Sequence, residues 1–217
     1  MEGQVAGTQK YESGVELVAY MPFITNWLRQ HCDTAGDLLV SCQSCCSEEK
    51  SYQLWSELMD GLEEYGDLTP NQLKRICSRN SPEVCASALM LVLTSNASPI
   101  TTPNFQSSML EAMKQVHEKD LKNGPKLADL LAPPLSKMQL TCLEALAQVC
   151  ALIRDTSTDP HVVARELAIP IFVGNNSGAS NVTLACKLMT VLVEFGEYIF
   201  GKPAQRSCVA PLGIRPS

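Results

Sequence analysis

Cysteine is the residue type with the most obvious potential for chemistry in this sequence. Four of the ten cysteines, Cys32, Cys42, Cys45 and Cys46, lie close together, and Cys42 and Cys45 have the C-x-x-C spacing of many metal and redox sites. A structural zinc site needs a second ligand pair, for which only Cys32, His31 or Cys46 is near, and the adjacent Cys45 and Cys46 cannot readily both face one ion from a helix. We therefore interpret this segment as a loop with ordinary thiols and predict no metal site. Zinc binding and a redox-active or acylated loop are the alternatives.

The remaining residues with nucleophilic potential show no catalytic pattern. Five cysteines fall on the apolar faces of expected helices, where small thiols usually serve as core residues: Cys77, Cys85, Cys142, Cys150 and Cys186. The three histidines are scattered, so nothing would orient a Cys–His pair. Neither a G-x-x-x-x-G-K-[S/T] loop nor a G-x-G-x-x-G loop occurs, and we predict no cofactor and no nucleotide bound by the chain itself.

Charge and composition exclude further classes of function. The chain has 17 basic and 23 acidic residues, a formal net charge of −6. Nucleic-acid binding needs a cationic face that releases counterions, so we predict none. The N-terminal segment lacks the basic and apolar regions of a signal peptide, and the longest apolar run, around residues 86–93, is too short to cross a bilayer. These features favour a cytoplasmic protein with reduced thiols and without a transmembrane segment.

Helical periodicity dominates the sequence between two polar ends. Residues 1–14 are predicted to be disordered, and residues 202–217, with three prolines, to form a tail. In the region 15–201, apolar residues recur every three or four positions, with little of the alternation typical of strands. The predicted fold class is all-α, a single-domain orthogonal bundle of about eight or nine helices. We expect helices over residues 14–30, 51–62, 69–78, 82–93, 102–117, 136–154, 161–169 and 181–200.

Three of these helices are expected to supply the core. Helix 82–93 is apolar nearly all round, and Ser136 is a candidate cap for helix 136–154. Helix 181–200 carries a continuous apolar stripe. We expect four leucines of these helices to be buried: Leu89, Leu143, Leu188 and Leu192.

Six short segments, in the same order along residues 15–200, resemble the RhoGAP domain family. Residues 36–42 (GDLLVSC) match the spacing of the family pattern Gly-x-Phe-Arg-x-Ser-Gly, and residues 97–100 (ASPI) stand where the family has Pro-Glu-Pro-Leu. The other four segments are 21–24 (MPFI), 130–134 (LLAPP), 166–169 (ELAI) and 197–200 (EYIF). The resemblance implies a RhoGAP-like helical fold and a small GTPase of the Rho family as the partner.

The sequence departs from the family pattern at the positions that serve GTP hydrolysis in the family. In the family, an arginine finger stabilises charge on the transferred phosphoryl group and accelerates hydrolysis by roughly 10³–10⁵. Leu39 stands at the finger position, and leucine cannot donate a hydrogen bond to phosphate. Met90 replaces a family lysine, Thr94 an arginine, and Glu166 an asparagine.

The resemblance therefore implies a pseudo-GAP, a RhoGAP-like module that does not accelerate GTP hydrolysis, and not an enzyme. Such a module would bind a Rho-family small GTPase or another signalling protein and regulate it by binding, with no catalytic residue. The residues expected at the partner surface are Leu38, Leu39, Ser41, Met90, Thr94 and Glu166. If Leu39 occupies the finger site, Leu39→Arg is expected to place a guanidinium at the rim of the binding groove.

Two alternatives stay open at this point. The chain could be an active GTPase activator with a displaced finger, for which Arg29, Arg75 and Arg79 are the candidates. It could also be a helical scaffold unrelated to GTPases, in which case the loop 36–46 would not lie beside the groove formed by the helix near Met90. Stimulated GTP hydrolysis distinguishes the first alternative from a pseudo-GAP.

Overall fold

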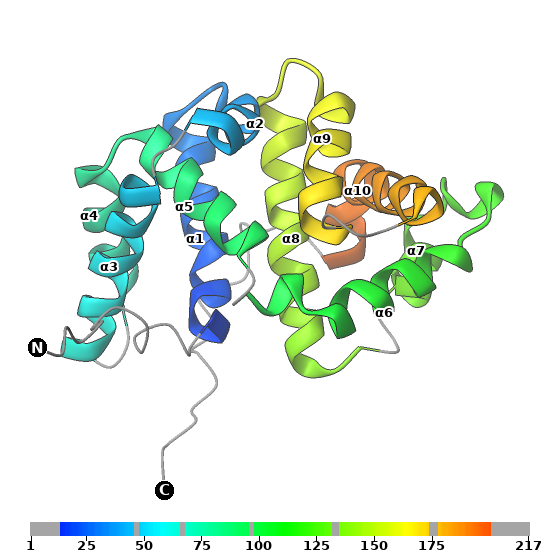
Figure 1. The fold of residues 1–217 in the computed structure, drawn as a ribbon, viewed down its shortest axis with the longest axis horizontal. Coiled ribbons are helices and arrows are strands. Elements are labelled where there is room, and N and C mark those ends of the chain that lie inside the picture. Colours follow the sequence, from blue (N-terminus) through cyan, green and yellow to red (C-terminus); the bar gives the residue numbers. More distant parts are fainter. Residues whose placement is uncertain are drawn as a thin grey trace, which may run out of the picture.

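The computed structural model describes residues 14–45, 48–65, 68–95, 98–131, 135–173 and 178–200. Within these ranges the chain forms helices and no strand, which confirms the all-α prediction (Figure 1). The elements are α1 (Gly14–His31), α2 (Ala35–Cys45), α3 (Glu48–Tyr65), α4 (Pro70–Arg79), α5 (Pro82–Thr94), the 3₁₀ turn η1 (Pro99–Thr101), α6 (Pro103–Lys114), the 3₁₀ turn η2 (Glu118–Asp120), α7 (Gly124–Leu131), α8 (Lys137–Thr156), α9 (Pro160–Phe172) and α10 (Ala179–Phe200). The predicted disordered segment, except Gly14, and the predicted tail lie outside the described residues.

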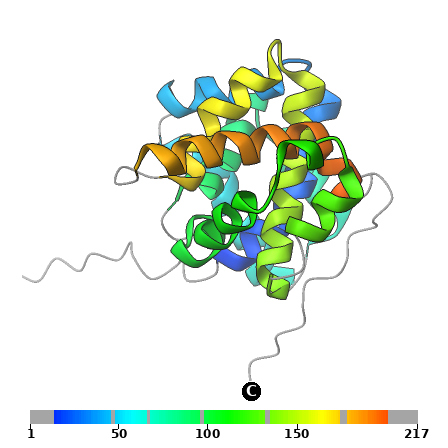
Figure 2. The same ribbon diagram turned by 90° about the vertical axis from the view of Figure 1, so that its right-hand side faces the viewer.

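Helices α1 and α8 form the centre of the bundle. They pack against each other, with α5 on the other side of α1 and with α2, α9 and α10 also against α8. Figure 1 shows α1 to α5 on one side of the molecule and α6 to α10 on the other, joined where α1 meets α8. In Figure 2, α10 runs across α8, and it also packs against α6 and α7. The helices cross one another, as expected for an orthogonal bundle.

One continuous apolar cluster fills the interior and draws on every α-helix whose side chains are described. Three of the leucines predicted to be buried, Leu89, Leu143 and Leu188, are 0% exposed, and Leu192 is 1% exposed. The prediction that these four leucines are buried is therefore confirmed. Full burial of such a side chain contributes about 1.5–3 kcal/mol to folding.

Polar caps and prolines set where several helices begin. Ser136 caps α8 as predicted, and it forms a capping box with Gln139 in which each side chain bonds the other residue's backbone N–H. Thr69 and Gln72 do the same for α4. Proline occupies the first turn of α4, α5, α6 and α9, where its missing N–H costs nothing.

Two helices of the bundle were not predicted. Residues 36–46 were expected to form a loop, but α2 covers most of this segment because Ala35, Leu39 and Cys42 form an apolar face that packs into the core. The second, α7, is short, and its buried Leu127 and Leu131 give only one repeat of the helical period. In segments this short, the apolar pattern alone does not distinguish a helix from a loop, and the tertiary contacts of the side chains are needed to do so.

Among the described residues, one stretch has the length and apolar composition of a membrane span. It runs from Pro82 to Thr101, over α5 and the following 3₁₀ turn, and 62% of its apolar window is buried inside the protein. The core helix of a water-soluble bundle has the same length and composition, so this stretch is weak evidence for a membrane segment.

Candidate functional site

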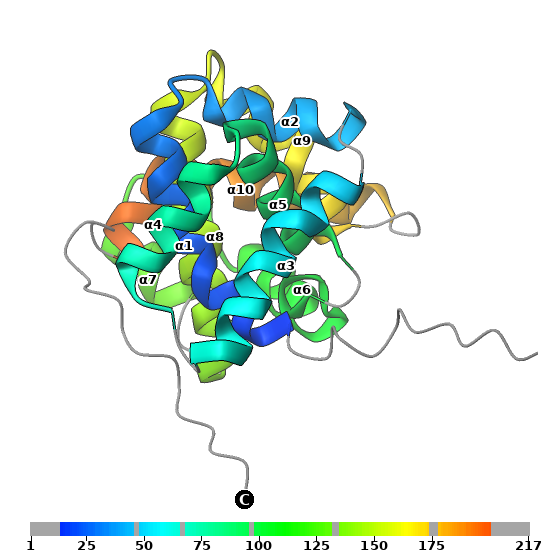
Figure 3. The same ribbon diagram turned by 90° about the vertical axis from the view of Figure 1, so that its left-hand side faces the viewer.

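The three elements that carry the predicted partner residues lie together. Helix α2 packs against both α5 and α9, and α5 also contacts α9. Figures 1 and 3 both place α2 beside α9 at one end of the bundle. Residues 36–45 therefore lie beside the helix that contains Met90.

Two of the predicted contact residues are not at the surface. Leu39 is 0% exposed and Met90 is 5% exposed, and both belong to the continuous core. The prediction that these side chains contact a partner is therefore wrong for this conformation. The physical reason is that α2 is a helix whose apolar face is covered by neighbouring helices, so Leu39 cannot project from a loop.

The other four predicted residues reach the surface. Ser41 and Glu166 are exposed, and Leu38 and Thr94 are half-buried. Each hydroxyl is held by its own helix, because Ser41 donates to the carbonyl of Asp37 at 3.2 Å and Thr94 to that of Met90 at 2.7 Å. These positions can contribute contact area and, at Glu166, a negative charge. They do not provide an acid–base pair.

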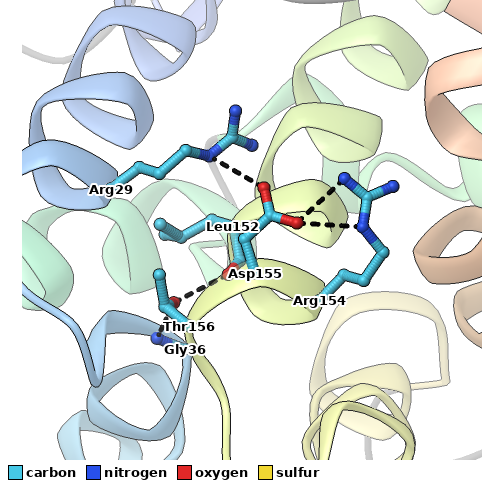
Figure 4. A network of polar contacts seen from close by, with 6 residues as sticks. All are labelled: Arg29, Gly36, Leu152, Arg154, Asp155 and Thr156. Carbon is cyan, nitrogen blue, oxygen red and sulfur yellow. Dashed lines mark hydrogen bonds and ion pairs between the residues drawn. The ribbon is translucent and has the colours of Figure 1, made fainter.

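Polar contacts fix the first turn of α2 to the end of α8. The Gly36 amide donates to Thr156 Oγ1 at 2.9 Å, and that hydroxyl donates onward to the Leu152 carbonyl at 2.7 Å (Figure 4). The Asp37 carboxylate accepts from both the backbone amide and the hydroxyl of Thr158, the latter at 2.8 Å. The orientation of α2 is thus determined by the α8–α9 connection.

Glycine at position 36 allows α2 and α8 to pack closely. A Cβ at this position would lie 2.0 Å from Ser157 Oγ and 3.0 Å from the Cα atom of Ile153. The contact with the Ser157 hydroxyl is shorter than any real Cβ contact, and the contact with Ile153 is tighter than nine in ten of them, so a larger residue at position 36 requires α2 and α8 to shift. The glycine that matches the family spacing in residues 36–42 therefore has a packing role here.

The candidate displaced fingers are located away from the α2–α5–α9 junction or are already paired. Arg29 Nε lies 3.3 Å from Asp155 Oδ2, and Arg154 contacts the other carboxylate oxygen at 2.9 Å (Figure 4). Arg75 and Arg79 are exposed on α4, which packs against α1 and α3. Because Arg29 and Arg154 share the Asp155 carboxylate, extending Arg29 to an external phosphate would break an ion pair.

The described cysteines are free thiols, most of them buried. Burial raises the pKa of Cys142 to about 11, and burial raises the pKa of Cys150 further. Contact with the Cys77 thiol, together with burial, raises the pKa of Cys85. Thiols with raised pKa values stay protonated near neutral pH and are poor nucleophiles. Cys77, Cys85, Cys142 and Cys150 are buried core residues as predicted, whereas Cys186 is only half-buried.

The cysteine-rich segment is only partly described. Cys42 is buried, and its thiol donates to the Glu83 carbonyl at 3.7 Å. The side chain of Cys45 and all of Cys46 lie outside the described residues. Within the described ranges, no three His, Cys, Asp or Glu side chains are grouped as metal ligands would be.

Sequence reasoning missed two surface features. Val162 and Ile169 are exposed on α9, off the buried stripe formed by Val163, Leu167 and Ile171. An open groove of about 600 Å³ lies between α6 and α7, and its lining includes Ser107, Glu111 and Asp129. The helical period places Val162 and Ile169 on one face of a helix, but the exposure of that face depends on the position of α9 in the bundle. The groove depends on the packing of a helix that was not predicted.

Comparison with known proteins adds no family assignment. No family model, no curated protein and no solved structure matches this chain. The functional interpretation therefore depends on the residue pattern and on the geometry described above.

Proposed function

We propose that this chain is a catalytically inactive RhoGAP-like module that binds a Rho-family small GTPase, or another signalling protein, and regulates it by binding. The main support is that α2, α5 and α9 pack against one another. These three helices contain the positions that correspond to the family's residues for GTP hydrolysis. At these positions the chain has Leu39, Met90, Thr94 and Glu166, none of which is cationic. A surface of this kind can recognise a protein but cannot neutralise a developing phosphoryl charge.

The absence of catalysis follows from the chemistry at position 39. A finger must deliver a guanidinium to the partner's active site, and Leu39 is both apolar and fully buried. Loss of a finger worth roughly 10³–10⁵ in rate removes about 4–7 kcal/mol of transition-state stabilisation. Arg29, the nearest candidate along the chain, is engaged by Asp155. We therefore expect no more than a few-fold stimulation of GTP hydrolysis.

The partner surface consists of the exposed parts of α2 and α9. Glu166 supplies the charge on α9, and Leu38 and Ser41 supply contact area on α2, the helix that packs against α9. Since Leu39 and Met90 are buried, they support this surface from below and do not touch the partner.

Binding is best measured with purified Rho-family GTPases loaded with GDP or with a non-hydrolysable GTP analogue. The wild-type chain should bind at least one of them, and Glu166→Arg should weaken binding by about tenfold through loss of a charge and addition of the opposite one. Lys74→Glu, at an exposed position on α4, is the matched control and should bind as the wild type does. Stimulation of hydrolysis by two or more orders of magnitude would refute the inactive assignment.

A helical scaffold that binds a protein other than a GTPase is the second candidate. The specific observation in its favour is the burial of Leu39 and Met90, which removes two of the six expected partner contacts. If a correctly folded chain binds none of the GTPases in either nucleotide state, this candidate replaces the first.

A further inference from the structure

One surface of α9 combines exposed apolar side chains with charges of both signs. Among the described residues, the large apolar side chains with substantial exposure are Tyr52, Val162 and Ile169, and two of these three belong to α9. Val162 is 38% and Ile169 44% exposed, and their separation of seven residues, two helical turns, places them on one face. Arg165 and Glu166 are exposed between them. We call these four residues the α9 strip.

The two charges lie on opposite sides of the apolar line. Because an α-helix turns by about 100° per residue, Arg165 and Glu166 each lie about 50° from the line that joins Val162 and Ile169, one on either side. The Arg165 Nε atom donates to the carbonyl of His161 in its own helix at 3.2 Å, and the guanidinium has further donors. Within the described ranges, no ion pair links Arg165 or Glu166 to another side chain.

We propose that the α9 strip is a two-fold interface between two copies of this chain, with their α9 helices side by side and parallel. In a parallel two-fold pair, the Arg165 side of one helix faces the Glu166 side of the other. Val162 and Ile169 then each meet their own counterparts, and two Arg–Glu pairs flank the apolar contact. An antiparallel pair would instead bring each side against itself, Arg165 on Arg165 and Glu166 on Glu166. Charge complementarity therefore selects a second copy and fixes its direction.

The size of the strip sets the strength of the dimer. Helix α9 has 13 residues, so its exposed face is smaller than the roughly 800 Å² per partner of a standard interface. We expect a weak dimer with a dissociation constant of about 10⁻⁵–10⁻⁴ M.

Self-association through the α9 strip goes beyond the proposed function and has a consequence for it. Glu166 also belongs to the proposed partner surface, so a chain paired through the strip could not bind its partner there. This consequence depends on the proposed function, whereas the dimer itself does not.

The test is sedimentation of the full chain over about 1 µM to 1 mM, without any partner. Glu166→Arg gives a chain with arginine on both sides of the apolar line, and Arg165→Glu gives one with glutamate on both sides. Each single variant should self-associate at least tenfold more weakly than the wild type. The double variant Arg165→Glu/Glu166→Arg exchanges the charges and should dimerise within about threefold of the wild type. Lys74→Glu is the control and should leave the association unchanged.

Mixing the two single variants gives the most specific result. In an equimolar mixture, every charge pair across a mixed dimer is opposite in sign, so the mixture should associate at least tenfold more tightly than either variant alone. A wild-type chain that remains monomeric at 1 mM, or single variants that associate as the wild type does, would overturn the proposal. The proposal would also be overturned if the two variants, shown to be folded by circular dichroism, formed no mixed dimers in the mixture. Because no partner is present, each of these results leaves the proposed function unaffected.

Discussion

The close approach of α2 to α8 at Gly36 provides the sharpest test of the structure. Gly36→Ala adds one methyl group, which would lie 2.0 Å from Ser157 Oγ, 3.2 Å from Ser157 Cβ and 3.0 Å from the Ile153 Cα atom. The hydroxyl can rotate away at small cost, but the Ile153 backbone can move only if α8 moves. The substitution therefore forces apart the two helices that determine where α2 lies.

The expected cost is that of overpacking a well-packed contact, about 1–3 kcal/mol. In a chain of this size each kcal/mol lowers the melting temperature by about 2–4 °C, so the expected decrease is about 2–12 °C. Thermal unfolding followed by circular dichroism measures it. Gly178→Ala is the matched control, because a Cβ at Gly178 meets no atom within 4 Å; it should change stability by less than about 0.5 kcal/mol.

A double-mutant cycle with Ser157 identifies the source of the strain. Ser157 Oγ is buried without a hydrogen-bond partner among the described residues, so Ser157→Ala alone should be neutral or slightly stabilising. In that background Gly36→Ala should cost less, with a coupling energy of about 0.5–2 kcal/mol, while the Ile153 contact keeps part of the penalty. If Gly36→Ala behaves like Gly178→Ala, or if the coupling is zero, the close approach of α2 to α8 described here is wrong.

Three further substitutions test burial, a buried carboxylate and helix packing. Leu39→Arg places an unpaired guanidinium in the core and should lower the free energy of unfolding, measured with urea, by about 4 kcal/mol or more. Leu38→Arg, at the half-buried neighbouring position, should lower it by less than about 1 kcal/mol. Equal costs would contradict the burial of Leu39. The Lys126 ammonium lies 2.6 Å from the Asp120 carboxylate and lowers the pKa of that carboxyl in the folded protein. The ion pair therefore stabilises the fold at pH values above the unfolded-state pKa of about 3.9. This stabilisation is lost as the pH falls through the lower folded-state pKa. Lys126→Met should therefore move acid unfolding, followed by circular dichroism, to higher pH, and an unchanged curve would show that the pair is not formed. Gly196→Ala in α10 makes only an ordinary contact at 3.4 Å and gains helix propensity, so it should raise the melting temperature by up to about 4 °C, and a decrease would indicate tighter packing of α10 on α8.

The parts of the fold that could be predicted are those with a long, regular apolar period. The helix around Leu89 is apolar nearly all round, and the apolar positions around Leu143 and Leu188 recur over more than two turns. Ser136 with Gln139 forms a capping box that local sequence alone specifies. These elements were predicted because their side chains face the core whatever the arrangement of the neighbouring helices.

The parts that could not be predicted depend on tertiary contacts. Leu38 and Leu39 are chemically identical neighbours, but one is half-buried and the other is 0% exposed. Which of them faces inward is decided by the start of α2, and that start is fixed by bonds from Gly36 and Asp37 to the distant end of α8. Similarly, spacing places Val162 and Ile169 on a helix, but only the position of α9 in the bundle shows that their side is open.

The burial of Leu39 changes how restoration of a catalytic arginine should be attempted. The expectation that Leu39→Arg places a guanidinium at a groove rim assumed a loop, whereas Leu39 lies on the covered face of α2. An apolar side chain at this position holds α2 onto the core. A charged side chain there would be more stable in water than in the core, so it would favour detachment of α2. Replacement of Leu39 by arginine therefore opposes the folding of α2 before it can assist a partner. Leu38 lies one residue away and is half-buried, so a guanidinium added there keeps access to solvent and should not unfold α2.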